Sequence, residues 1–213
     1  MDITTNRQQP LPHAGKLRLS NDDGLARVVD SNGRRARLRP EAGTPVHGVI
    51  ATGTLTGTTI AADDTVTIAD LTYTFVDALS EDTGDAVPYE VLVGATDSDS
   101  LDNLIAAING DTGEGTLYGT GTVAHPSVTA AAGAGDTMDV SFTAGAGVAG
   151  NDIATTATLT SGDWGAANLE GGVDATEGIL GDQLFDSTNL YQCLADVTKT
   201  STSGWKKIAF SAL

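Results

Sequence analysis

Arg35, Arg37 and Arg39 are the residues whose type and spacing point most directly to chemistry. Ala36 and Leu38 alternate with them, so a strand here would place three guanidinium groups on one face. A guanidinium group suits a carboxylate partner because its planar fork can donate two parallel hydrogen bonds. Three interpretations of this row stay open: a docking strip for an acidic protein surface, a solvated strand face, and a contact with nucleic acid.

The arginine row belongs to a chain whose charges are segregated along its length. Eight of the 11 Lys and Arg residues lie in residues 1–39 and the other three in residues 199–213. Residues 40–198 contain no basic side chain but 24 of the 28 acidic ones, and the net charge is −17. The middle therefore cannot neutralise phosphates, and we expect no nucleic-acid or membrane partner for it. The segregation predicts a molecule anchored by its ends, with an acidic body in solvent.

The residues that could bind a metal do not match the spacing of a metal site. His13, His47 and His125 have no His, Cys or Glu at ligand spacing, whereas a metal site needs three or four convergent ligands. The Asp residues near 97–102 and 136–139 lack the glycine turn and closing Glu of a calcium loop. We therefore predict no metal and no cofactor, and weak surface binding of calcium stays open.

Catalytic patterns are also missing from the sequence. The glycine-rich stretch 145–150 is not followed by the Lys of a phosphate-binding loop, and there is no Gly-x-Ser-x-Gly elbow. Cys193 is the single cysteine, which excludes an internal disulfide, and we expect a buried, inert thiol. The prediction is a protein that is not an enzyme and has no small-molecule substrate.

Hydrophobic patterning predicts an α+β fold that is mainly β. Alternation over 65–68 and 72–76 is typical of a β-hairpin, and Asn32-Gly33 favours a second hairpin near the N terminus. One amphipathic helix is expected because Leu101, Leu104, Ile105 and Ile108 have helical spacing. Ser98, Asp99 or Ser100 would cap its start and Gly110 its end. Further strands are expected over 16–19, 26–30, 35–39, 49–55, 89–93, 123–130, 138–144, 153–159, 179–185, 190–195 and 205–210.

These elements divide the chain into three predicted parts. Residues 1–45 form an N-terminal arm and basic hairpin, residues 46–174 an acidic displayed α+β domain, and residues 175–213 a short C-terminal β module. Trp205 lies between Gly204 and Lys206 in that module. It is either part of the core of the terminal sheet or an anchor at an interface, where tryptophan is enriched.

Two stretches resemble structural proteins of tailed bacteriophages. In the middle, the strand pairs are followed by Leu101-Asp102-Asn103-Leu104-Ile105-Ala106-Ala107-Ile108-Asn109 and then by Val128-Thr129-Ala130. This order is similar to a module of tailed-phage virion proteins and also resembles the IN motif of flagellin and hook-associated proteins. The end, with Leu190-Tyr191-Gln192-Cys193 and Trp205-Lys206-Lys207-Ile208, resembles a short tail of phage head-fibre and decoration proteins.

The resemblance implies a non-enzymatic virion component that is made in the host cytoplasm and displayed on the capsid surface. Its expected role is that of a decoration (cement) protein or short head fibre bound to the major capsid protein. Families of this kind are often trimeric, so a homotrimer is expected. The expected docking residues are Arg35, Arg37, Arg39 and Trp205.

Two other classes of function remain open. A phage tail or fibre protein could act as a host-receptor adhesin, with the acidic domain binding a glycan or receptor. A flagellar-type filament protein is the third class, but such proteins usually have long terminal helices, and neither end of this chain has that pattern.

Overall fold

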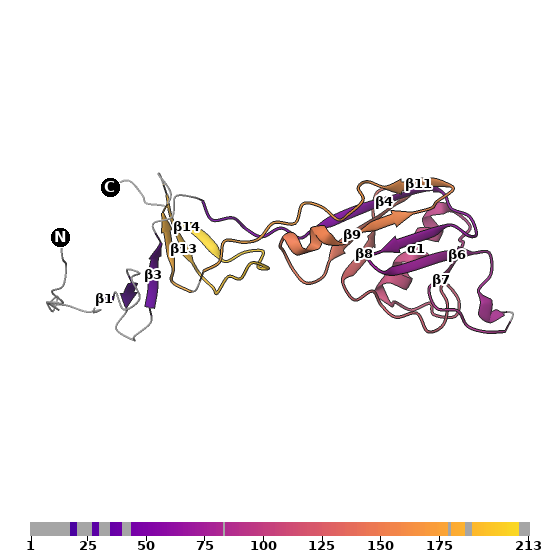
Figure 1. Ribbon diagram of the computed structural model, residues 1–213, viewed down its shortest axis with the longest axis horizontal. Coiled ribbons are helices and arrows are strands. Elements are labelled where there is room, and N and C mark those ends of the chain that lie inside the picture. Colours follow the sequence, from indigo (N-terminus) through magenta and orange to yellow (C-terminus); the bar gives the residue numbers. More distant parts are fainter. Residues whose placement is uncertain are drawn as a thin grey trace. The chain divides into compact units, whose positions relative to one another are not determined.

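The computed structural model describes residues 44–82, 84–178, 180–185 and 189–208, together with the backbone of three strands nearer the N terminus (Figure 1). The architecture is α+β and mainly β, as the sequence predicts. One α-helix, α1 (Asp97–Asn109), and two 3-10 helices, η1 (Ser80–Asp82) and η2 (Val148–Asp152), are found in the described residues. The strands are β1 (Arg18–Ser20), β2 (Arg27–Val29), β3 (Arg35–Arg39), β4 (Thr52–Thr59), β5 (Thr65–Ile68), β6 (Leu71–Val76), β7 (Glu90–Leu92), β8 (Val128–Ala132), β9 (Thr137–Phe142), β10 (Thr155–Ala157), β11 (Ser161–Trp164), β12 (Gln183–Phe185), β13 (Leu190–Cys193) and β14 (Trp205–Ile208).

The chain divides into two compact units. The first, here called the terminal unit, consists of Met1–Val46, Thr176–Thr198 and Ser203–Leu213. The second, called the acidic unit, consists of His47–Ala175 and the short segment Lys199–Thr202. Four residues that are late in the sequence thus belong by their contacts to the acidic unit.

Two four-stranded sheets and α1 build the acidic unit. The strand orders are β10-β5-β6-β7 and β11-β4-β9-β8. The predicted hairpin is confirmed, because β5 and β6 pair antiparallel from Thr65 opposite Thr74 to Ile68 opposite Leu71. The helix packs against β7 of the first sheet and against β8, β4 and β9 of the second. Its apolar face therefore closes the core between strands of both sheets.

The helix forms where its apolar spacing predicts, but its start is two residues earlier than the earliest predicted cap. Leu101, Leu104 and Ile108 are buried, and Gly110 ends the helix in the left-handed conformation at φ 66°. The N-cap is Thr96, whose hydroxyl accepts from the Asp99 backbone N–H while the Asp99 carboxylate accepts from the Thr96 N–H. This reciprocal capping box satisfies two backbone donors that the helix itself leaves free.

Asp64 joins two of the connections that run between the sheets. Its side chain lies between the end of β4 and the start of β5 and is only 7% exposed. Oδ2 accepts hydrogen bonds from the backbone N–H groups of Ala61 and Thr160, each at 2.9 Å, and Oδ1 accepts from the Thr160 hydroxyl at 3.2 Å. Thr160 lies in the connection from β10 to β11. One carboxylate thus fixes two of the places at which the chain changes sheet, the β4–β5 and β10–β11 connections.

Asn109, the last residue of α1, pairs with strand β8 as another strand would. Its amide nitrogen donates to the Ala130 carbonyl at 2.9 Å, and its amide oxygen accepts from the Ala130 N–H at 2.9 Å. β8 lies at the edge of its sheet, where unpaired backbone groups invite pairing with another chain. The Ile-Asn pair noted in the sequence therefore has a physical basis: Ile108 is buried and Asn109 covers the edge strand.

Replacing Asn109 with Asp is expected to lower the free energy of unfolding by about 2 kcal/mol, because the carboxylate cannot donate and would face the Ala130 carbonyl. Urea denaturation followed by circular dichroism measures the change. Asp102→Asn, which alters an exposed carboxylate of α1, is the control and should change stability by less than about 0.5 kcal/mol. Equal stability of the Asn109→Asp protein and the wild type would contradict this role.

Tyr73 has a buried hydroxyl without a hydrogen-bond partner among the described residues. Its side chain is fully buried in β6, and its ring meets that of Tyr89 edge-on with centroids 5.7 Å apart. Burial, and secondarily the neighbouring Tyr89, raises the pKa of Tyr73 well above the ordinary phenol value. The folded state therefore holds this proton at an alkaline pH at which the unfolded state has released it.

Tyr73→Phe is expected to leave stability at pH 7 unchanged or to raise it by up to about 1 kcal/mol, because it removes an unsatisfied buried group. Above about pH 10 the wild type should lose stability as pH rises, since the unfolded state binds fewer protons than the folded state. The phenylalanine variant should lose less over the same range. Denaturant titrations at neutral and alkaline pH test both points, and a marked loss of stability at pH 7 would reveal a partner for the hydroxyl.

The sheet of the terminal unit joins the two ends of the chain. Its strand order is β1-β2-β3-β12-β13-β14, and four of its five strand pairings are antiparallel. The N-terminal strands meet the C-terminal ones through parallel pairing of β3 with β12, with Leu38 opposite Gln183 and Arg39 opposite Leu184. The N-terminal hairpin and the C-terminal module, which the sequence predicts as separate parts, thus share one sheet.

Candidate functional site

The six-stranded sheet of the terminal unit gathers basic residues from both ends of the sequence. Arg35, Arg37 and Arg39 occupy alternate positions of β3, which is a strand as predicted, while Lys206 and Lys207 belong to β14. The β2–β3 ladder sets Arg27 opposite Arg37. The side chains of the three arginines lie outside the described residues, so their docking role stays a prediction.

β14 supplies the basic side chains that the structure does describe in this sheet. Lys206 and Lys207 are exposed, whereas Trp205 is 6% exposed and its indole N–H donates to the Thr176 carbonyl at 2.6 Å. Of the two interpretations of Trp205, this burial supports the one that places the residue in the core of the terminal sheet. A docking role for Trp205 stays a prediction.

The two units differ strongly in formal net charge. The terminal unit holds ten of the 11 basic residues and nine acidic ones, for a formal net charge of +1. The acidic unit holds 19 acidic residues and one lysine, for −18. Two units of one chain therefore present very different electrostatic potentials to a partner.

The residues considered for metal binding have structural roles where the structure describes them. His125 is buried: Nδ1 accepts from the Ser127 N–H, which leaves Nε2 to donate to the Ile68 carbonyl at 3.1 Å. Asp97 accepts from the Ile60 N–H, and Asp139 accepts from the Thr54 hydroxyl. Within the described ranges, no three His, Cys, Asp or Glu side chains gather as metal ligands would.

Cys193 is free and fully buried, as expected. Burial raises the pKa of its thiol, and the thiol donates to the Ala195 carbonyl at 2.7 Å. A thiol that stays protonated and out of solvent is a poor nucleophile.

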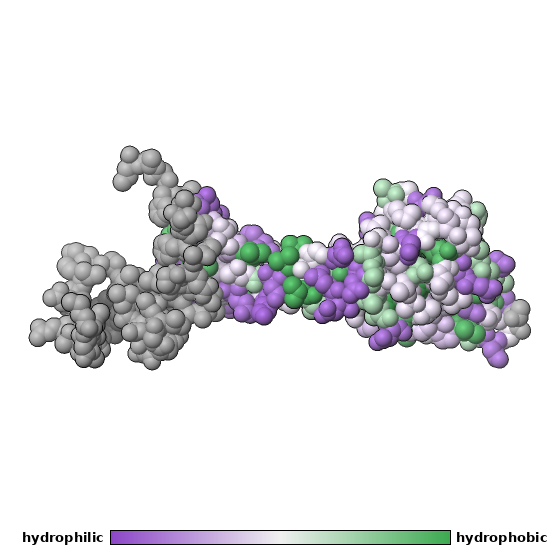
Figure 2. Space-filling model, turned by 45° about the horizontal axis from the view of Figure 1, so that its top comes forward, coloured by the Kyte–Doolittle hydropathy of each residue, from purple (hydrophilic) through white to green (hydrophobic). Residues whose placement is uncertain are grey.

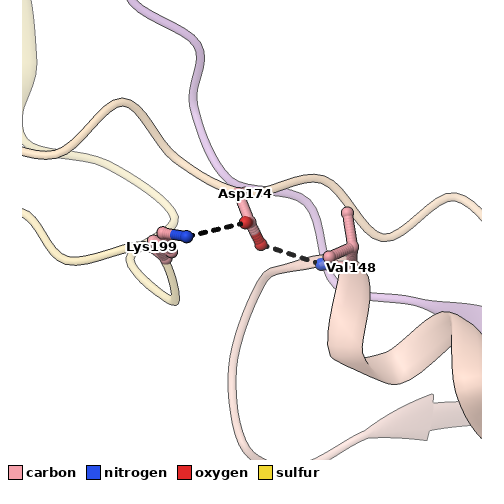
Figure 3. A network of polar contacts seen from close by, with 3 residues as sticks. All are labelled: Val148, Asp174 and Lys199. Carbon is pink, nitrogen blue, oxygen red and sulfur yellow. Dashed lines mark hydrogen bonds and ion pairs between the residues drawn. The ribbon is translucent and has the colours of Figure 1, made fainter.

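The segment Lys199–Thr202 closes onto the acidic unit and forms a surface that sequence reasoning did not predict. The Lys199 carbonyl accepts from the Ala175 N–H at 2.9 Å, and the Thr200 carbonyl accepts from the Ala146 N–H at 3.0 Å. Asp174 lies at the centre of this surface: Oδ1 accepts from the Val148 N–H at 2.9 Å, and Oδ2 is 3.8 Å from the Lys199 ammonium (Figure 3). The only basic residue of the acidic unit is thus held beside a carboxylate.

Glycine allows this close approach. Gly147 has φ 126°, and a Cβ there would lie 2.8 Å from Asp174 Oδ1. A Cβ at Gly48 would collide with the Ser201 carbonyl and the Ala146 side chain. These glycines let four segments that are distant in sequence meet without intervening side chains.

Three exposed valines are connected to Asp174 through the backbone. Val49 and Val173 face each other across an antiparallel bridge with two backbone hydrogen bonds, and Val148 is the residue whose N–H binds Asp174. They are 48%, 39% and 53% exposed. We call Val49, Val148, Val173, Asp174 and Lys199 the valine–lysine surface. Isolated valines in glycine-rich stretches have no periodicity, so no sequence signal identified it.

A shallow depression of about 310 Å³ lies between β10, β11 and residues 166–167. Trp164 and the exposed Asp163 contribute to its wall, with Thr155, Thr156 and three alanines around them. The Trp164 indole N–H already donates to the Thr156 carbonyl at 3.2 Å. The ring is 8% exposed, so it offers an edge rather than a face to a ligand.

Comparisons with protein-family models, with curated proteins and with solved structures give no match to this chain. In the described part of the chain, no helix is long and apolar enough to span a membrane.

Proposed function

We propose that this protein is a non-enzymatic structural component of a tailed-phage virion that binds the outer capsid surface as a decoration (cement) protein or short head fibre. Its partner is the major capsid protein, and its copies associate as a homotrimer. It is made in the host cytoplasm and resides on the virion. One observation carries the proposal: both basic ends join in one sheet. That sheet belongs to a unit of net charge +1, whereas the acidic unit carries −18.

The proposed docking uses the basic strands of the terminal unit. Arginines suit carboxylates on an acidic shell, and exposed Lys206 and Lys207 add attraction that steers the approach. The acidic body is repelled by such a shell, which orients the molecule with that body outward. A subunit that binds only the assembled shell stabilises it by mass action, and many copies on a symmetric lattice add weak contacts.

Co-sedimentation of the purified protein with empty, undecorated heads tests this function. Binding should saturate at a fixed number of copies per head. It should weaken from about 0.01 M to about 1 M salt, over which the screening length falls from roughly 30 Å to roughly 3 Å. Failure to bind heads at any salt concentration would overturn the proposal.

A phage tail or fibre adhesin is the second candidate function, and the depression beside Trp164 favours it. An aromatic edge, a carboxylate and threonine hydroxyls are groups that can contact a neutral sugar, while the charge of the unit disfavours an anionic one. Binding to purified tails or host cells that Asp163→Asn abolishes, without binding to heads, would support this alternative.

A further inference from the structure

We infer that the outer edge of β14 receives an extended, acidic segment of the partner as a further strand of the terminal sheet. The inference deepens the proposed function, on which it rests, by naming the form in which the major capsid protein is bound. Among the described strands, β14 is the last of its sheet. An outer strand has a row of backbone N–H and C=O groups that no neighbouring strand uses, and an extended peptide can pair with them.

The pairing of β13 shows which backbone groups of β14 face outward. Cys193 donates its N–H to the Asp182 carbonyl at 2.9 Å and accepts from the Gly181 N–H at 2.8 Å, so both groups point away from β14. Trp205 lies opposite Cys193, and this pair therefore exchanges no hydrogen bonds. The backbone groups of Trp205 point outward, as do those of Lys207 two residues later. Within the described ranges, no other segment donates to or accepts from them.

Outer strands of the acidic unit are covered by the chain itself. The Leu92 N–H of β7 donates to the Leu117 carbonyl at 2.9 Å. On β10, the Thr155 N–H donates to the Ala167 carbonyl at 2.9 Å. The Asn109 side chain pairs with β8. Three of the four outer strands of that unit thus have partners, whereas no described segment covers β14.

The charge on β14 selects an acidic occupant. Lys206 and Lys207 are both exposed, and as neighbours in a strand they project to opposite faces of the sheet. A carboxylate on either face of an added strand would therefore lie near an ammonium group, and opposite charges on paired strands stabilise the pairing. Figure 2 shows apolar residues scattered among hydrophilic ones over the described surface, so recognition by charge and backbone hydrogen bonds suits this chain.

A second copy is a poor occupant of the same edge. Pairing β14 with β14 of another copy would bring Lys206 and Lys207 beside the same lysines of that copy, and like charges on paired strands destabilise the pairing. Lysine on an outer strand is a common means of preventing such self-pairing. The two lysines thus oppose pairing between copies and favour an acidic strand from another protein.

Amide hydrogen exchange of the full chain, followed residue by residue by NMR, tests whether the edge is open. The Lys206 N–H points toward β13 and should exchange slowly. The Lys207 N–H points outward and should exchange about ten-fold faster or more. Slow exchange at Lys207 in the protein alone would show that the edge is already covered and would overturn the inference.

A blocked peptide of alternating threonine and glutamate, about ten residues long, is the probe for the acidic strand. At millimolar concentration it should slow exchange at Lys207, and the effect should decrease as salt is added. The same peptide with glutamine in place of glutamate should bind about ten-fold more weakly. The peptide with every amide N-methylated keeps its charge but should give no protection. Equal binding by the glutamate and glutamine peptides would contradict the acidic occupant, and protection by the methylated peptide would contradict strand addition.

Two substitutions at one position separate the backbone edge from the charge. Lys207→Pro removes the outward N–H, which the pairing with β13 does not use, and outer strands accept proline at such a position. Lys207→Thr removes the same charge and keeps the N–H. The threonine variant should bind the peptide a few-fold more weakly than the wild type, and the proline variant about ten-fold more weakly still. Circular dichroism and thermal denaturation check that both variants fold. A folded proline variant that binds like the threonine variant would overturn the inference.

Co-sedimentation of these variants with empty heads separates the inference from the proposed function. Loss of head binding in the proline variant, with most binding kept in the threonine variant, would support both. Head binding that is the same in the two variants would leave the capsid proposal standing and overturn strand addition at β14. Peptide binding at β14 without any binding to heads would support the acidic-strand edge and overturn the capsid proposal.

Discussion

Replacing Arg35, Arg37 and Arg39 together with glutamate is expected to abolish binding to empty heads and incorporation into virions. The change shifts the formal net charge of the terminal unit from +1 to −5, so attraction to an acidic shell becomes repulsion. Loss of charge-paired contacts at an interface typically costs several kcal/mol, which corresponds to a fall in affinity of a thousand-fold or more. We expect the acidic unit to keep its fold, because β3 is not part of its sheets.

Co-sedimentation with heads and quantification of copies per virion measure this effect, and two further variants separate charge from geometry. Arg35, Arg37 and Arg39 changed to lysine keep the charge but lose the planar fork, so binding should weaken without disappearing. Lys199→Glu makes the same type of charge reversal in the acidic unit and should leave head binding nearly intact. Normal occupancy by the triple glutamate protein would show that the arginine row is a solvated strand face.

Asp64→Ala is expected to lower the free energy of unfolding by about 3–4 kcal/mol, the largest stability effect that we predict. The substitution leaves the partly buried backbone N–H groups of Ala61 and Thr160, and the Thr160 hydroxyl, without their acceptor. Hydrogen bonds to a charged group contribute about 1.5–3 kcal/mol each, and the remaining unsatisfied donors add a desolvation cost. Because Asp64 joins two of the connections between the sheets, the two sheets should lose stability together.

Urea denaturation monitored by circular dichroism and by tryptophan fluorescence measures the effect of Asp64→Ala. Asp64→Asn keeps an acceptor oxygen of similar shape but lacks the charge, and it should lie between the alanine variant and the wild type. Asp102→Ala removes an exposed carboxylate from α1 and should change stability by less than about 0.5 kcal/mol. A loss of less than 1 kcal/mol for Asp64→Ala would show that solvent replaces the carboxylate at this crossover.

Elements formed by contacts close in sequence were predictable, whereas β11 was not predicted. The helix and the 65–76 hairpin follow from spacing of three to four residues and of two residues, respectively. β11 has the sequence Ser161-Gly162-Asp163-Trp164, which has little strand propensity, and it pairs with β4 across a bulge at its first two residues. Residues 123–127, predicted as the start of a strand, are irregular, and His125 there joins the end of α1 to the 65–76 hairpin.

The sequence by itself determined the acidic middle, the basic ends, the mainly β composition and the single amphipathic helix. These are sums over residues or patterns of a few residues, so they can be read without knowing which distant segments meet. Only the tertiary structure decided that β3 pairs with β12, that Trp205 is buried and that Val49 pairs with Val173. Those outcomes depend on contacts between residues far apart in the chain, whose partners are chosen by packing and by hydrogen bonds of the whole fold.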